Sequence, residues 1–208
     1  MTSLPSRIVH GLAWAAGIST RHAKRLGRMR ILMLHGVGHR GFEGEDFERI
    51  LVFLEQHFEL VSLAELVHRT LSRLRIHGRE IALTFDDGLR NNATVAYPLL
   101  REMGVPATFF VCPGLIDEGR WLWNHEARAR LEHLDPRVVA RIRESLEFEA
   151  PARGETEVDA IVEGMKGFGL PRRQEVEASI RKQTRDFEPQ PVHRRAYDVV
   201  TWDELRRL

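Results

Sequence analysis

The chain has 208 residues, of which 43% are apolar and 29% charged, so it can bury a hydrophobic core beneath a solvated surface. Its 31 Lys and Arg residues balance 30 Asp and Glu residues, and a net charge of +1 favours neither nucleic acid nor an acidic partner. Cys112 is the only cysteine, which excludes an internal disulfide. These bounds predict a single domain over residues 1–208.

The amino-terminal segment, residues 1–30, joins a short apolar run to a basic stretch. His10 interrupts the apolar run from Ile8 to Ile18, which makes it a poor signal peptide and too short for a membrane span. The basic stretch leaves two interpretations open, peripheral contact with an anionic membrane or a helix packed on the domain, and the packed helix is favoured. We therefore expect the protein to be cytoplasmic or peripheral to the membrane.

Apolar runs and amphipathic runs alternate along the chain as far as residue 111, which predicts an α/β fold with parallel strands. Ser62 and Glu65 have the spacing of a capping box, and Gly104 followed by Pro106 should end a helix. The elements expected are strands at 30–35, 59–61, 80–85 and 105–111, and helices at 45–58, 62–74 and 92–103.

Residues 120–196 are rich in Arg and Glu and predict a helical insertion, with helices near 124–134, 155–168 and 172–184. Two interpretations stay open, a lid over a substrate or a solvated helical layer, and the solvated layer is favoured. Trp121 and Trp123 could stack on sugar rings, although such amphipathic aromatics more often pack at a helix start.

The strand pattern from Ile81 to Phe85 stops at two adjacent carboxylates, Asp86 and Asp87, which are followed by Gly88. The carboxyl ends of parallel strands are where α/β folds carry their chemistry. One acid could hold a metal while its neighbour takes a proton from water, which suits amide hydrolysis. The alternative is a structural role, in which Asp87 caps backbone amides near Gly88, and spacing alone does not decide between the two.

The run Thr84–Gly88, read with Ile31–His35 upstream and Val105–Val111 downstream, resembles the polysaccharide deacetylase family, also called NodB-like or carbohydrate esterase family 4. The resemblance implies a distorted (β/α) barrel that removes N-acetyl groups from a carbohydrate substrate. It also implies a divalent metal ion, zinc or similar, with Asp86 as the general base and Asp87 as a metal ligand. His35 ends the first strand, where we expect it to line the substrate pocket, and the alternative is a histidine with a purely structural role.

One departure from the family pattern concerns its second motif, His-(Ser/Thr)-x-x-His, which normally follows a segment like Thr201–Leu205. The chain ends at Leu208, so this ligand pair is missing and the barrel is expected to be incomplete at the carboxyl end. Either the natural protein continues, or the chain is a truncated, catalytically inactive module that binds a glycan or a partner. The open edges of an incomplete sheet favour a homo-oligomer, or cover by the helical insertion.

The pair His35 and His39 has the i, i+4 spacing of the missing ligand motif. The two intervening glycines, Gly36 and Gly38, favour a loop over a helix, so the spacing fixes no ligand geometry. We expect His39 to be exposed and to take no part in the site.

Overall fold

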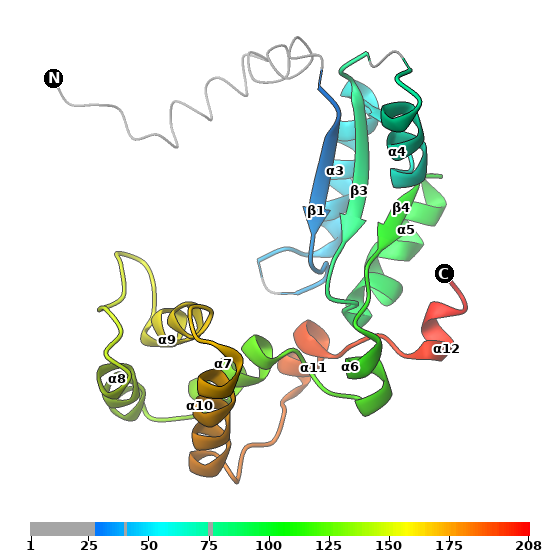
Figure 1. The fold of residues 1–208 in the computed structure, drawn as a ribbon. Coiled ribbons are helices and arrows are strands. Elements are labelled where there is room, and N and C mark those ends of the chain that lie inside the picture. Colours follow the sequence, from blue (N-terminus) through cyan, green and yellow to red (C-terminus); the bar gives the residue numbers. More distant parts are fainter. Residues whose placement is uncertain (1–27, 40, 75–76) are drawn as a thin grey trace, which may run out of the picture. The chain divides into compact units, whose positions relative to one another are not determined.

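The computed structural model describes residues 28–39, 41–74 and 77–208 (Figure 1). The chain divides into two compact units: unit 1 comprises Met1–Cys112 and Trp202–Leu208, and unit 2 comprises Pro113–Thr201. The amino-terminal segment expected at 1–30 lies almost wholly outside the described residues. That residues 1–208 act as one domain stays a prediction. No helix in the described part is long and apolar enough to cross a membrane.

A parallel sheet organises unit 1 around its central strand, β3 (Glu80–Phe85). Strand β1 (Arg30–Leu34) pairs along one edge of β3, while β2 (Glu59–Leu60) and β4 (Ala107–Phe109) share the other edge. This arrangement confirms the mixed α/β fold. Within the described residues the sheet has four strands and is not closed, so the expected barrel is not confirmed. Strand β4 is shorter than predicted because its partner β3 ends at Phe85.

Apolar side chains at helical spacing pack α3 (Gly44–His57) against this sheet, as its sequence pattern predicts. Phe47, Leu51 and Leu54 are its buried residues. The Phe85 ring lies edge-on to Phe47 at a centroid distance of 5.7 Å and stacks on Phe109 at 5.0 Å. These aromatic contacts pack the carboxyl end of β3 against α3 and β4.

Helix α4 (Leu63–Leu71) begins at Ser62, whose hydroxyl accepts a hydrogen bond from the Glu65 amide at 3.0 Å. Only half of the expected capping box forms, because the Glu65 carboxylate binds Arg69 Nε at 2.7 Å. Arg69 also binds Glu59 of β2 and lies 3.5 Å from the buried Glu80 of β3. This arginine therefore joins the helix to two strands. The helix ends at Leu71, three residues earlier than predicted.

The helix predicted at 92–103 is two elements, a π-helical turn η1 (Asn92–Ala96) followed by α5 (Tyr97–Glu102). Pro98 has no amide hydrogen to donate, and the preceding Tyr97 amide donates five residues back to the Asn92 carbonyl. The helix ends before Gly104, which adopts a left-handed φ of +66° as expected.

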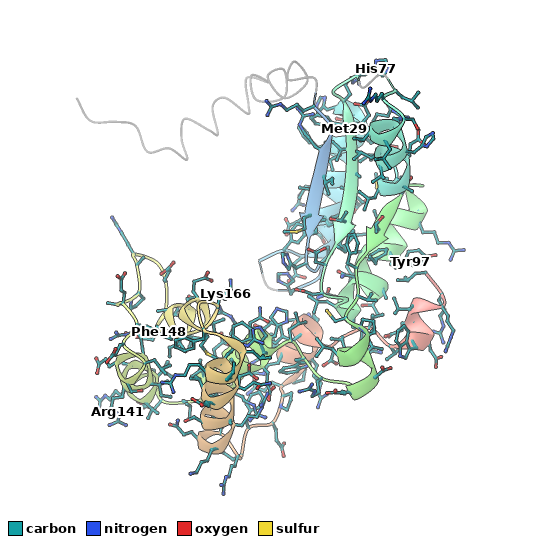
Figure 2. All side chains as sticks on the ribbon, viewed as in Figure 1. Met29, His77, Tyr97, Arg141, Phe148 and Lys166 are labelled. Carbon is teal, nitrogen blue, oxygen red and sulfur yellow. The ribbon has the colours of Figure 1, made fainter. Side chains whose placement is uncertain are left out.

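Unit 2 consists of helices around a hydrophobic core of its own, which includes Ile161, Met165 and Ile180. Phe148 (Figure 2) packs closely on helix α9 (Glu157–Met165), and a methyl group added at Gly164 would lie 2.7 Å from its ring. The helices are α6 (Pro113–Glu118), α7 (Trp123–Glu132), α8 (Pro136–Ser145), α9 (Glu157–Met165), α10 (Leu170–Gln183) and α11 (Pro191–Tyr197). Three of these, α7, α9 and α10, lie where the sequence predicts helices.

Candidate active site at the end of β3

The backbone turns sharply where β3 ends. The Asp86 amide still donates to the Leu34 carbonyl at 2.8 Å, which extends the pairing with β1 by one residue. Asp87 and Gly88 then adopt left-handed conformations, with φ of +71° and +63°. Few residues other than glycine accept such a φ, and aspartate is among them because its short polar side chain can bond locally.

Gly88 is required at this turn for a second reason, which is the close approach of the segment that follows β4. A methyl group built at Gly88 would lie 3.1 Å from Val111 Cβ and 3.2 Å from Val111 Cα, and a backbone atom cannot move aside easily. No local sequence pattern indicates this contact.

At the carboxyl ends of β1 and β3, His35 and Asp86 both interact electrostatically with the carboxyl group of Asp87. Burial raises the pKa of the Asp87 carboxyl, the positive charge of His35 lowers it, and the charge of Asp86 raises it again. Both aspartates are half-buried and His35 is exposed. The three residues that the sequence selected therefore lie in one neighbourhood, where the charge of the Asp87 carboxyl is poorly solvated.

Cys112 follows β4 and joins the same neighbourhood. Burial raises the pKa of its thiol, and the charge of Asp87 raises it further, so the thiol stays protonated. The structure leaves Cys112 half-buried within reach of the Asp87 charge. A raised pKa argues against a nucleophilic role.

The glycines between His35 and His39 form a loop, as predicted. Val37 donates to Asn91 Oδ1 at 3.3 Å, and Gly38, with φ of +86°, donates to the Phe42 carbonyl at 2.9 Å. His39 is not exposed, contrary to expectation, because its ring lies edge-on to Phe42 at 6.5 Å.

The short helix α12 (Trp202–Leu205) is tied to the same part of unit 1. Glu204 Oε1 accepts a hydrogen bond from Arg90 Nε at 2.7 Å, and Arg90 follows Asp87 by three residues. No local sequence signal identifies this pair, because its members lie 114 positions apart. The contact brings the end of the chain close to the turn after β3.

Two side chains near the end of β3 carry the atom types that divalent cations bind. Asp87 has carboxylate oxygens, and His35 in the same neighbourhood has imidazole nitrogens. Within the described residues, no group of three or more His, Cys, Asp and Glu side chains could hold a metal ion. A complete ligand shell is therefore not formed by this part of the chain.

The fold and the site define an α/β protein with two adjacent carboxylates at the carboxyl end of a central parallel strand. Residues 75–149, which contain β3 and both aspartates, match the family model described as polysaccharide deacetylase. This match confirms the resemblance inferred from Thr84–Gly88 over residues 75–149, which make up less than half of the chain.

Two solved structures are similar to the chain. A deacetylase PplD from Streptococcus pyogenes, in complex with acetate, is 19% identical with a TM-score of 0.39, and the match covers 54% of this chain and 62% of that chain. IcaB from Ammonifex degensii is 18% identical with a TM-score of 0.42, over 86% of this chain and 79% of that chain. No curated protein matches the sequence. Both TM-scores lie below 0.5, so neither structure adds to the family match.

Proposed function

We propose that this protein removes N-acetyl groups from a carbohydrate substrate by metal-dependent hydrolysis. The observation that carries the proposal is the pair Asp86 and Asp87, held half-buried by a left-handed turn at the end of β3 within the segment that matches the family. Hydrolysis of an amide needs a base for the attacking water and a polarised carbonyl. Two adjacent carboxylates in different backbone conformations can divide these tasks.

In this proposal Asp86 is the general base and Asp87 is a metal ligand. Burial opposes a bare charge on Asp87, and a bound divalent cation would compensate that charge. Zinc or a similar ion would polarise the acetyl carbonyl when bound. Asp86, whose backbone amide donates a hydrogen bond to the Leu34 carbonyl, would accept the proton of water. The exposed His35 would contact the sugar at the same strand ends.

The test is acetate release from N-acetylglucosamine oligosaccharides, measured together with the zinc content of the protein. Asp86→Asn should lower the rate by about 10²- to 10⁴-fold and leave zinc binding unchanged. Asp87→Ala should lose both acetate release and zinc binding. Glu48→Gln removes an exposed carboxylate on α3 and should change neither quantity. Equal loss of zinc in the two aspartate variants would contradict the division of roles.

A second candidate is a catalytically inactive module that binds a glycan or a partner. It is favoured by the lack of any three-ligand group within the described residues. Glycan binding without acetate release, at saturating zinc, would support this alternative over the enzyme.

Self-association of unit 1 is a further part of the proposal. On β1, the Ile31 and Met33 side chains are 55% and 54% exposed, as expected for a sheet that is not closed. Within the described residues no strand pairs with the outer edge of β1, and pairing of copies along this strand would cover these side chains. Size-exclusion chromatography with light scattering should find a dimer or larger species, and a monomer at all concentrations would contradict this. Peripheral membrane contact through residues 1–30 stays a prediction.

A further inference from the structure

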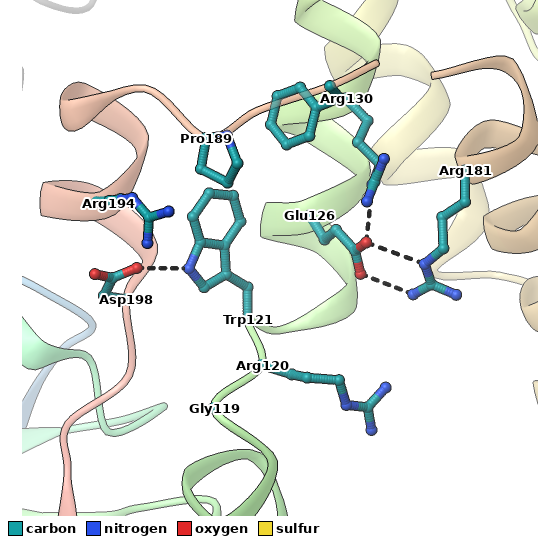
Figure 3. A pocket seen from close by; sticks show the side chains of 10 residues that line it. Gly119, Arg120, Trp121, Glu126, Arg130, Arg181, Pro189, Arg194 and Asp198 are labelled. Atoms are coloured by element: carbon teal, nitrogen blue, oxygen red, sulfur yellow. Dashed lines mark hydrogen bonds and ion pairs between the residues drawn. The ribbon is translucent and has the colours of Figure 1, made fainter. Parts of the chain in front are cut away.

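Unit 2 contains a pocket of about 460 Å³, apart from the candidate active site of unit 1 (Figure 3). Its volume is within the range of small-molecule sites. The chain segment before α7, helices α7, α10 and α11, and the segment between α10 and α11 all contribute to its walls. Its charged and aromatic lining includes Trp121, Glu126, Arg130, Arg181, Arg194 and Asp198.

One wall is the indole of Trp121, which is fixed in orientation. Its Nε1 donates to Asp198 Oδ1 at 2.8 Å, and its ring lies edge-on to Tyr197 at 5.6 Å (Figure 3). Tyr197 is the last residue of α11, so the indole is held against the end of that helix. A half-buried indole in a fixed orientation offers a flat apolar surface of the kind on which a sugar ring stacks.

A second wall is a cluster of ion pairs that is already satisfied. The Glu126 carboxylate accepts two hydrogen bonds from Arg181, at 3.0 and 2.7 Å, and one from Arg130 at 2.8 Å. Arg130 also donates to the Thr184 carbonyl at 3.0 Å and lies over the Phe187 ring at 5.0 Å. Three hydrogen bonds from two guanidinium groups therefore compensate the charge of Glu126 within the cluster.

The remaining charges of the pocket leave a surplus of positive charge. Four guanidinium groups line it, those of Arg120, Arg130, Arg181 and Arg194, against the carboxylates of Glu126 and Asp198. Arg120 is ion-paired with Glu118, which lies outside the lining. The exposed guanidinium of Arg194 has no hydrogen bond or ion pair to any described residue. It is therefore the group that a ligand anion would meet.

From this arrangement we infer that the pocket of unit 2 binds a sugar that carries a carboxylate, with its ring on Trp121 and its carboxylate on Arg194. The guanidinium is a planar donor that matches a carboxylate in a bidentate pair. The inference rests on the proposed function only for the carbohydrate nature of the ligand. The anion preference follows from the pocket alone.

The test is isothermal titration calorimetry of the full chain with methyl glucuronide and methyl glucoside. Methyl glucuronide should bind at least about 10-fold more tightly, which corresponds to about 1.4 kcal/mol. Arg194→Gln should abolish this preference. Trp121→Ala should weaken both sugars, whereas Trp121→Phe, which keeps a flat ring but loses the bond to Asp198, should retain the preference. Arg185→Gln removes the same charge from an exposed position outside the lining and should bind like the wild type.

Equal affinity for the two sugars, or an unchanged preference in Arg194→Gln, would overturn the inference. Inorganic phosphate or acetate binding as tightly as methyl glucuronide would show a general anion site and overturn the role of Trp121. Asp86→Asn should bind methyl glucuronide normally. Loss of acetate release with intact glucuronide binding, or the reverse, therefore separates failure of the proposed function from failure of this inference.

Discussion

The two units hold their functional side chains by different physical means. In unit 1 the backbone positions Asp86 and Asp87, through a strand hydrogen bond and two consecutive left-handed residues. In unit 2 side chains position one another, with three guanidinium contacts around the Glu126 carboxylate. A backbone-built site tolerates few substitutions in its turn, whereas a site of ion pairs depends on solution pH.

The largest expected effect distinguishes the two hydrophobic cores, which share no buried residue. Phe85→Ala should destabilise unit 1 by about 3–5 kcal/mol, and Met165→Ala should destabilise unit 2 by about 2–5 kcal/mol, because each removes a fully buried side chain. Hydrogen exchange with mass spectrometry should show faster exchange only in peptides of the altered unit. Equal loss of protection in both units would mean that they unfold as one.

The ion-pair cluster of unit 2 should make its stability depend on acid pH. The hydrogen bonds from Arg181 lower the pKa of the Glu126 carboxyl most, burial raises it, and the hydrogen bond from Arg130 lowers it further. The net effect is a pKa below the usual range. The stabilisation is thus present above the unfolded pKa, about 4.3, and is lost as the pH falls through the lower folded value. Glu126→Gln should cost about 1–3 kcal/mol at neutral pH.

Urea unfolding followed from pH 7 to pH 3 would check this dependence on Glu126. The difference between wild type and Glu126→Gln should shrink as the medium becomes more acidic. A constant difference over this range would show that the charge on Glu126 contributes nothing.

The turn after β3 can be compared with a second left-handed glycine in unit 1. Gly104→Ala should cost about 1–2 kcal/mol, because φ is +66° and no atom lies within 4 Å of the added methyl group. Gly88→Ala has the same backbone cost and in addition crowds Val111 at 3.1 Å. Thermal unfolding should therefore show a larger loss for Gly88→Ala. Similar losses would mean that the segment at Val111 moves aside freely.

The smallest effects concern the helix caps of the two units. Ser62→Ala and Thr156→Ala should each cost about 0.5–2 kcal/mol. Thr156 should cost more, because its hydroxyl accepts from the Asp159 amide while the Asp159 carboxylate accepts from the Thr156 amide, a reciprocal pair that Ser62 lacks. Chemical denaturation of both variants would rank them, and a larger loss for Ser62→Ala would reverse the comparison.

Local patterns predicted most of unit 1 because its elements are specified by local chemistry. The apolar run Ile81–Phe85 forms the central strand, and the face of Phe47, Leu51 and Leu54 is buried. The π-helical turn at Asn92–Ala96 was missed because it depends on how Pro98 interrupts the helix ladder. Helix α8 was missed although Asp135 and Pro136 provide a start signal, with Asp135 accepting from the Arg137 amide at 2.8 Å.

The candidate sites were predicted only in part, since contacts between distant residues leave no local pattern. Adjacent carboxylates at a strand end identify Asp86 and Asp87, but nothing near them indicates Arg90–Glu204 or the approach of Val111. In unit 2, Trp121 was noted as an aromatic side chain, yet its partner Asp198 lies 77 positions away. Both its place in the pocket wall and its hydrogen bond to Asp198 depend on the fold.

The pair Arg90 and Glu204 also has a consequence for the order in which the protein is made. Unit 1 contains chain segments on both sides of unit 2, so α12 is synthesised only after the whole of unit 2. The contact closes a loop of 114 positions, and the entropic cost of closing a loop falls when its interior is already compact. A ribosome-bound chain should therefore form the sheet and unit 2 before α12 attaches. Unit 1 gains the contact between Arg90 and Glu204 only after α12 has been synthesised.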